Sequence, residues 1–266
     1  MARRDLGRWA IVTGASSGIG AALARALTAA GCACVLVARR RAALEEVAAS
    51  LPPARALVWP ADVSSPESGP ELAAALAERG IEPDLLVLNA GFGIYGALVE
   101  ADPARLGALV DTNCRSPLLW TRTFLPGMLQ RNRGGILLVA STGGLVPMPY
   151  YASYGASKAF VVSLGRSLAT ELRGSGVGVL TLCPGPVHTG FFAVAEAPGP
   201  LGSPQGAVQT PQQVAAEAIA AWRGGQTLHT CGATNRLAMT AGRLLPPDWV
   251  DAVARRVLRP KRRGQS

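Results

Sequence analysis

The N-terminal region contains the run Trp9-Ala10-Ile11-Val12-Thr13-Gly14-Ala15-Ser16-Ser17-Gly18-Ile19-Gly20. Its first five residues predict a short buried strand, and an Ala/Leu-rich helix follows the glycines as far as Gly31, a natural C-cap. A second apolar run covers residues 34–38, so the stretch is a βαβ unit. Glycines let the backbone approach a pyrophosphate, and the free N–H groups of a helix start bind its charge. The run therefore predicts a nucleotide site; the alternative is a tight turn without a ligand.

The alternation of strands and helices continues through the chain. Apolar runs at 56–59, 85–88, 136–140 and 177–182 are predicted strands, 227–230 is a possible further strand, and long helices are expected at 103–130 and 152–172. We find no internal boundary and no repeat, so residues 1–266 are expected to form a single domain. The pattern predicts an α/β fold with a doubly wound parallel sheet and helices on both faces. The chemically informative residues follow strand ends, where open parallel sheets bind ligands.

The helix expected at 152–172 begins with Tyr154-Gly155-Ala156-Ser157-Lys158. Residues four apart share a helix face, so the Tyr154 hydroxyl and the Lys158 ammonium are expected to project together. A nearby cation favours the phenolate and is predicted to lower the pKa of Tyr154 from its usual value of about 10. The chain has 24 arginines and two lysines, so a compact ammonium at position 158 suggests a specific role. The pair predicts a proton-transfer unit; an ordinary shared helix face is the alternative.

The composition limits the classes of function. The formal net charge is +9, but six positive charges fall at Arg255, Arg256, Arg259, Lys261, Arg262 and Arg263, with no acid between them. The rest of the chain is nearly neutral, which argues against nucleic acid as the main partner. The five cysteines form no C-x-x-C pair, and no metal site is predicted. No apolar run reaches about 18 residues, so no transmembrane span is expected, and the protein is interpreted as cytoplasmic.

Six motifs occur along the chain: Thr13-Gly14-x-x-x-Gly18-x-Gly20, Asn89-Ala90-Gly91, Asn113, Ser141, Tyr154-x-x-x-Lys158 and Pro184-Gly185. In their order and spacing, over residues 8 to 190, the chain resembles the short-chain dehydrogenase/reductase family in its single-domain branch. The extended branch of that family usually carries T-G-x-x-G-x-x-G in place of the glycine spacing found here. The resemblance implies a Rossmann-like fold and an oxidoreductase that acts on CH–OH groups with a nicotinamide cofactor.

The resemblance implies a catalytic set of four residues. Tyr154 would donate a proton to a carbonyl oxygen, or remove one from an alcohol. Lys158 would lower the pKa of Tyr154 and hydrogen-bond the nicotinamide ribose, and Ser141 would hold the carbonyl oxygen beside Tyr154. Asn113 would support a water that resupplies protons through Lys158. For Asn113, helix polarity with a backbone hydrogen bond is the alternative.

The resemblance also implies where the cofactor lies. Pro184, Gly185, Val187 and Thr189 would border the nicotinamide, with Thr189 on its carboxamide, and Asp62-Val63 resembles the segment that cups the adenine. The complete set of expected cofactor-binding residues is Gly14, Ser16, Ser17, Gly18, Ile19, Gly20, Arg39, Arg40, Asp62, Val63, Asn89, Ala90, Gly91, Tyr154, Lys158, Pro184, Gly185, Val187 and Thr189.

The residues after the second predicted strand indicate which nicotinamide cofactor is used. An acid about twenty residues after the glycines binds the NAD ribose 2′-hydroxyl, whereas an arginine accommodates the NADP phosphate. Here Ala38 is followed by Arg39-Arg40-Arg41, with no carboxylate. The alternative is a charge cluster at a helix start, but cations there oppose the helix dipole. The sequence therefore favours NADP(H).

Residues near the predicted pocket are mainly apolar or aromatic, which fits an apolar ketone or aldehyde better than a sugar or a charged acid. They are Phe92, Ile94, Tyr95, Val146, Met148, Tyr151, Phe191 and Phe192. Residues 188–209 are rich in Ala, Gly and Pro, lack periodicity and are interpreted as a mobile substrate lid. Thr210-Pro211 then starts a helix as N-cap and N1.

Residues 248–266 are expected to form a basic C-terminal helix and tail. One side of the helix carries Trp249, Val250, Val253, Val257 and Leu258. Docking of this side on the domain is the favoured interpretation, and peripheral contact with an anionic membrane surface is the alternative. In the family, two long helices pair between subunits, so 103–130 and 152–172 imply a homodimer or homotetramer.

The sequence therefore predicts an NADP(H)-dependent oxidoreductase that reduces an apolar ketone or aldehyde to the alcohol, or catalyses the reverse, with Tyr154 as acid/base. The first alternative is a catalytically inactive, cofactor-binding regulatory or scaffold protein of the same fold. Its expected signature is a broken Ser-Tyr-Lys set, and here the set is intact. A further alternative makes the basic tail the main function, with the domain as a carrier.

Overall fold

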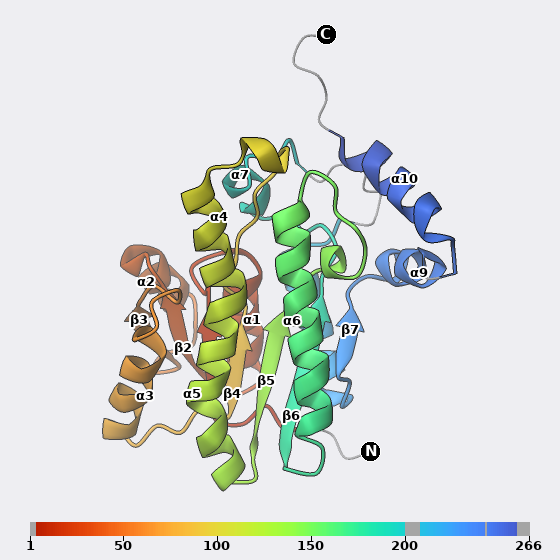
Figure 1. Cartoon of the computed structure of the whole chain (residues 1–266). Helices are drawn as coiled ribbons and strands as arrows, with labels where there is room; N and C mark the ends of the chain where they lie inside the picture. Colours follow the sequence, from red (N-terminus) through yellow and green to blue (C-terminus); the bar gives the residue numbers. More distant parts are fainter. Residues whose placement is uncertain (1–3, 200–207, 243, 260–266) are drawn as a thin grey trace.

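The structure is a computed structural model that describes residues 4–199, 208–242 and 244–259. In this part of the chain, seven strands form one parallel sheet in the order β3-β2-β1-β4-β5-β6-β7 (Figure 1). The strands are β1 (Trp9–Thr13), β2 (Ala33–Ala38), β3 (Ala56–Pro60), β4 (Leu85–Leu88), β5 (Gly134–Val139), β6 (Val177–Cys183) and β7 (Leu228–Thr230). The predicted α/β fold is confirmed, and the possible strand at 227–230 is β7.

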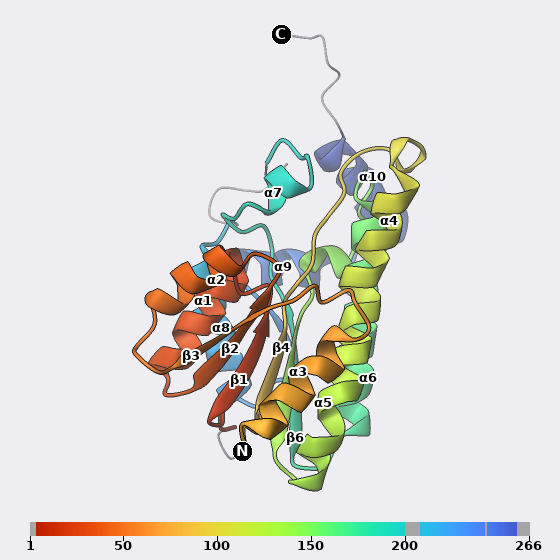
Figure 2. The ribbon, with the colours of Figure 1, turned by 90° about the vertical axis from the view of Figure 1, so that its left-hand side faces the viewer.

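Helices cover both faces of the sheet, as Figure 2 shows. One face carries α1 (Gly18–Ala29), α2 (Arg41–Ala49) and α8 (Pro211–Arg223), and the other carries α3 (Ser68–Glu78), α5 (Ser116–Gln130) and α6 (Ala152–Glu171). Each layer buries its own core: Leu23, Leu44 and Trp222 on the first face, and Trp120 and Val161 on the second. None of the described helices is long and apolar enough to cross a membrane.

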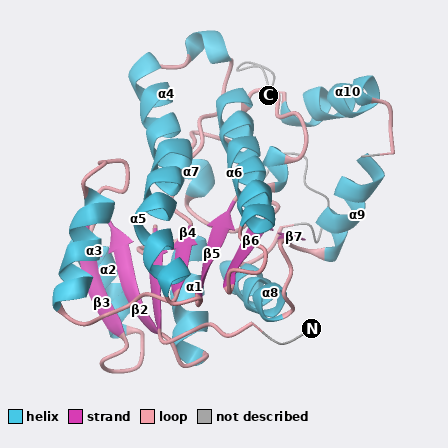
Figure 3. Cartoon of the chain, turned by 60° about the horizontal axis from the view of Figure 1, so that its bottom comes forward, coloured by secondary structure: helices cyan, strands magenta, loops and turns pink. Residues whose placement is uncertain are grey.

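The remaining helices lie towards the carboxyl ends of the strands (Figures 1 and 3). They are α4 (Pro103–Val110), α7 (Phe191–Val194), α9 (Ala233–Gly242) and α10 (Pro247–Leu258), with 3₁₀ turns η1 (Leu98–Glu100) and η3 (Thr142–Gly144). The helix expected at 103–130 is interrupted by a π-helical segment, η2 (Asp111–Arg115). Asn113 lies in this interruption.

Strand order reverses between β1 and β4, and such a switch point is where open parallel sheets bind ligands. Two turns meet there. Asn89, after β4, donates its side-chain amide to the Thr13 carbonyl at 2.9 Å, and its backbone N–H bonds the Thr13 hydroxyl at 2.9 Å. These bonds fix the glycine turn after β1 against the Asn89 turn after β4.

Local signals account for several helix ends. Gly31 has φ +101° just past α1, the left-handed conformation that ends many helices. Thr210 caps α8 through a reciprocal pair of bonds with Gln213. Part of the predicted lid forms α7, a single helical turn. Residues 200–207 of the predicted lid and 260–266 of the predicted tail lie outside the described residues.

Candidate active site

A cavity of about 920 Å³ lies at the carboxyl ends of the strands. It is lined by Ser141, Tyr154 and Lys158 and by every expected cofactor-binding residue except Gly20. Of the expected apolar wall, Phe92, Met148, Tyr151, Phe191 and Phe192 line it, whereas Ile94, Tyr95 and Val146 do not. Motifs that are far apart in the sequence therefore meet in one place.

The glycine turn between β1 and α1 shapes one end of this cavity. Gly18 adopts φ +56°, and a Cβ atom at Gly20 would lie 2.3 Å from the Gly14 carbonyl oxygen. Gly20 therefore acts by allowing the turn to close. Among the described residues, no side chain caps the start of α1, and its first turn holds no acid. The free N–H groups there suit a phosphate of a dinucleotide.

Arg39 and Arg40 follow β2 at the same end of the cavity. Both are exposed, and no described acid forms an ion pair with either. Arg41 differs, because it is outside the cavity lining and pairs with Glu45 at 3.7 Å. Burial acts to raise the pKa of Asp62, but hydrogen bonds from Ser64 and the charge of Arg39 hold it below its usual value. Two cations are thus available for a phosphate.

Tyr154 is buried, and burial raises its pKa to about 12, although a side-chain hydrogen bond with Ser141 acts in the opposite direction. Burial lowers the pKa of Lys158 to about 8. The expected lowering of the Tyr154 pKa by Lys158 is not found. The Lys158 ammonium donates to the Val139 carbonyl at 2.9 Å and lies 5.9 Å from the centroid of the Tyr154 ring. Desolvation of the phenolate is therefore the dominant effect.

Asn113 lies outside the main cavity, with its side chain buried. Its Oδ1 accepts from the Phe92 N–H at 3.1 Å, and its Nδ2 donates to the Phe92 carbonyl and to the Ser157 hydroxyl, both at 2.9 Å. A second cavity of about 10 Å³ lies between Asn113, Ser116 and Lys158. That volume is about the size of one water molecule, and all three side chains are polar.

Aromatic side chains cover Tyr154. Its ring lies 5.1 Å from Phe191 of α7 and 6.1 Å from Tyr151, between centroids. The segment that carries Phe191 is held against α4. Arg105 of α4 forms an ion pair with Glu196 and donates to the Val194 carbonyl at 2.6 Å. The described part of the predicted lid therefore packs directly on Tyr154.

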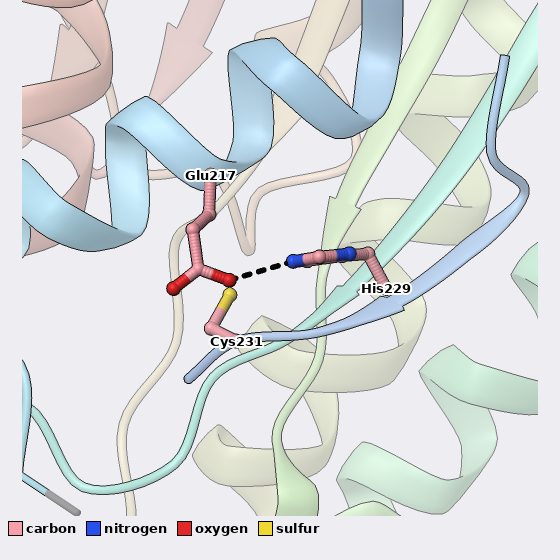
Figure 4. A group of neighbouring side chains, drawn as sticks. All are labelled: Glu217, His229 and Cys231. Carbon is pink, nitrogen blue, oxygen red and sulfur yellow. Dashed lines mark hydrogen bonds and ion pairs between the residues drawn. The ribbon is translucent and has the colours of Figure 1, made fainter. Parts of the chain in front are cut away.

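Behind the cavity, Glu217 of α8 is the centre of a polar group that sequence reasoning missed (Figure 4). Its carboxylate bonds His229 Nε2 and Gln209 Nε2 at 2.8 Å, and Arg236 and the Gly232 N–H at 3.0 Å. Glu217, His229 and Cys231 offer ligand atoms within 4.8 Å of one another. However, both Glu217 oxygens already accept N–H bonds, the Arg236 cation is adjacent, and burial raises the pKa of the Cys231 thiol. The group fits a structural support better than a metal centre.

This support reaches the segment after β6. The Gln209 backbone pairs with Pro186 and His188, at 3.0 and 2.9 Å. On the other side, a Cβ atom at Gly185 would meet the Asn235 amide at 2.3 Å. Glu217 thus braces the segment expected to border the nicotinamide. Glu217, His229 and Arg236 come from three separate elements, α8, β7 and α9. No local pattern in the sequence therefore marks this group.

Comparison with known proteins agrees with this geometry. The family model for short chain dehydrogenases matches residues 8–198. A short chain dehydrogenase of Pseudocercospora fijiensis is 32% identical over 212 residues, which is 78% of this chain. The chain spans 65% of that relative's length.

Two solved structures are similar over most of the chain. A short-chain dehydrogenase from Sphingobium yanoikuyae in complex with NADPH has a TM-score of 0.79 and 25% identity, covering 98% of each chain. A 3-ketoacyl-(acyl-carrier-protein) reductase from Brucella melitensis, complexed with NADH, has a TM-score of 0.76 and 29% identity, covering 85% of this chain and 96% of the other. Sequence motifs, fold and family model agree, and the chain therefore belongs to the short-chain dehydrogenase/reductase family of oxidoreductases.

Proposed function

We propose that the protein is an NADP(H)-dependent oxidoreductase that reduces an apolar ketone or aldehyde to the alcohol, or catalyses the reverse. The observation that carries this proposal is the single cavity that joins Ser141, Tyr154 and Lys158 to the glycine turn and to Arg39 and Arg40. Similar proteins were solved with NADPH and with NADH, so the choice of cofactor rests on this chain's own residues.

The residues fit the cofactor along the whole cavity. The uncapped start of α1 would hold the diphosphate, and Arg39 and Arg40 would hold a 2′-phosphate. Asp62 and Val63 would border the adenine, and the segment from Pro184 to Thr189 would border the nicotinamide. When bound, the reduced nicotinamide supplies a hydride equivalent to the carbonyl carbon.

Side chains of the protein supply the proton that the carbonyl oxygen takes up. Ser141 and Tyr154 share a hydrogen bond, so both hydroxyls can point at one carbonyl oxygen. Tyr154 gives its proton to that oxygen as the alcohol forms, and the high pKa keeps it protonated until then. Lys158 would then return a proton to Tyr154, and the water-sized cavity beside Asn113 supports a relay to Lys158.

The wall of the cavity supports an apolar substrate. Phe92, Met148, Tyr151 and Phe191 form much of the surface near Tyr154. Arg105 also lines the cavity, but its charge is matched by Glu196. Among the described residues of this wall, Arg105 therefore offers a negatively charged substrate little net charge.

The proposal is tested by following NADPH absorbance with a panel of ketones, aldehydes and alcohols. Oxidation of NADPH by at least one apolar carbonyl compound is expected, with little response to sugars or charged acids. Binding of NADPH without turnover on any member of the panel would favour the cofactor-binding scaffold instead.

Arg39→Asp is expected to reduce or reverse a clear preference for NADPH over NADH. The new carboxylate would repel the 2′-phosphate and accept a hydrogen bond from a free 2′-hydroxyl. The measurement is kcat/KM with each cofactor. Arg41→Asp is the matched control, because it makes the same charge change outside the cavity. Equal use of both cofactors by the unmodified protein would contradict the assignment of Arg39 and Arg40.

A homodimer or homotetramer is expected to form through α4, α5 and α6. Val110, Leu118 and Phe160 are exposed on these helices, and burial of such side chains favours association. Light scattering should give a mass two or four times 27.4 kDa. Phe160→Glu should lower that mass, whereas Leu237→Glu, at an exposed site on α9, should not. A mass near that of one chain for the unmodified protein would refute the prediction.

A further inference from the structure

The apolar residues of α10 divide into two adjacent sides. At about 3.6 residues per turn, Val250, Ala254 and Leu258 share one side, and Trp249, Val253 and Val257 share the next. The first side faces the domain: these residues are partly covered, Leu258 lines the cavity, and its carbonyl accepts from the Tyr95 hydroxyl at 3.1 Å. The second side is exposed, with 67% of Trp249 and 61% of Val253 accessible. The favoured interpretation, docking of this stripe on the domain, therefore holds for Val250 and Leu258 and is wrong for Trp249, Val253 and Val257.

The exposed side of α10 is one part of a larger surface. Leu98, Val99 and Val194 are also exposed, in η1 and α7, and Val99 is 93% accessible. Figures 1 and 2 place α7 and α10 at the same end of the molecule as the start of α4, which η1 precedes in the chain. Val194 of α7 and Leu258 of α10 both line the cavity. We call these residues the apolar rim: Leu98, Val99, Val194, Leu244, Leu245, Trp249, Val253 and Val257. Large exposed side chains concentrated at one end are typical of an interaction surface.

Positively charged side chains lie on the same helix as part of the apolar rim. Arg255, Arg256 and Arg259 are exposed at the end of α10. At about 3.6 residues per turn, Arg256 is next to Trp249 around the helix, and Arg259 and Arg255 follow further round. Within the described chain, no acid forms an ion pair with any of the three. In the sequence, residues 243–263 contain seven arginines and lysines against two acids, Asp248 and Asp251. Glu100 and Asp102 of the neighbouring loop offset only part of this excess.

An apolar stripe with a basic flank is the pattern of a helix that lies in a membrane interface. We propose that α10 and the apolar rim bind the surface of an anionic lipid membrane, which would turn the mouth of the cavity towards the bilayer. Trp249 and Val253 would enter the boundary between headgroups and acyl chains, and Arg255, Arg256 and Arg259 would contact lipid phosphates. The proposal does not rest on the proposed reaction, because it uses the exposure and charge of this surface alone.

Co-sedimentation of the full chain with vesicles tests the proposal. Vesicles of phosphatidylcholine are compared with vesicles that also contain phosphatidylglycerol, at low salt and at about 0.15 M salt. Binding to the anionic vesicles is expected at low salt, and weaker binding at the higher salt. Trp249→Ser/Val253→Ser and Arg255→Gln/Arg256→Gln should each weaken the apparent affinity about tenfold or more.

The matched control is Arg79→Gln/Arg173→Gln, which removes two exposed arginines at the opposite end of the molecule and should leave vesicle binding unchanged. Unfolding midpoints of all variants check that the fold is intact. The proposal fails if the unmodified chain does not bind anionic vesicles at low salt, or if the control weakens binding as much as the rim variants do. It also fails if the Trp249→Ser/Val253→Ser variant has a lower molar mass in light scattering but an unchanged affinity for vesicles. That result would mean that a second copy of the chain covers this surface.

Discussion

Tyr154→Phe is expected to lower kcat by about 10²- to 10⁴-fold, the usual contribution of a positioned acid or base. The ring and its contacts with Tyr151 and Phe191 are retained, so the cavity should keep its shape. Only the transferable proton and the bond with Ser141 are lost. NADPH affinity, measured by fluorescence titration, should therefore remain close to that of the unmodified protein.

Tyr151→Phe is the control for this experiment. Tyr151 is also buried and lines the same cavity, but its hydroxyl has no hydrogen-bond partner among the described residues. Removing that hydroxyl should leave kcat within a few-fold of the unmodified value. Substantial turnover by Tyr154→Phe would exclude Tyr154 as the proton donor, and an equal loss in Tyr151→Phe would show that the effect is not specific to the Tyr154 hydroxyl.

Lys158→Met is expected to abolish turnover and yet to stabilise the folded protein near pH 7. Burial lowers the pKa of Lys158 from 10.5 to about 8, so keeping its charge costs about 3 kcal/mol in the free energy of unfolding. Methionine has a similar volume and no charge. It leaves the Val139 carbonyl without its donor, which costs about 1–3 kcal/mol. A net gain of up to about 2 kcal/mol is expected.

The pH dependence identifies the cause of this gain. Below pH 8 the folded and unfolded states both hold the Lys158 proton, so the cost of the buried charge is constant. Between about pH 8 and 10.5 only the unfolded state stays protonated, and the stability of the unmodified protein rises relative to Lys158→Met. Urea unfolding at pH 7 and pH 9.5 should show the difference shrinking. Lys158→Arg, which keeps a charge, should lose turnover without the gain. A Lys158→Met variant less stable than the unmodified protein at pH 7 would contradict this account.

The fold could be predicted because its signals are local. Each apolar run of four to seven residues became a strand, and Gly31 and Thr210-Pro211 marked helix ends through their backbone preferences. The cavity followed from the same logic, because in a parallel sheet all strands end at one edge. Residues after six different strands therefore had to meet.

Three features could not be predicted from the sequence, because each depends on how distant residues pack together. The direction of the Tyr154 pKa shift follows from the burial of its hydroxyl, which a four-residue spacing does not encode. The Glu217 group unites α8, β7 and the start of α9. Which apolar residues of α10 are covered and which are exposed depends on the contact between the end of this helix and Tyr95.

The bond between Tyr95 and Leu258 also affects how the protein should be handled. Because Leu258 of α10 lines the cavity, a purification tag fused to the C-terminus would be joined to the chain only eight residues after the site and after the proposed lipid surface. Arg4 lies near the amino-terminal end of β6, where it donates to the Val179 carbonyl at 3.3 Å and lies over the Trp222 ring. A tag at the N-terminus is therefore the better choice for kinetic and vesicle-binding work. Assays of C-terminally tagged protein should be repeated after the tag is cleaved.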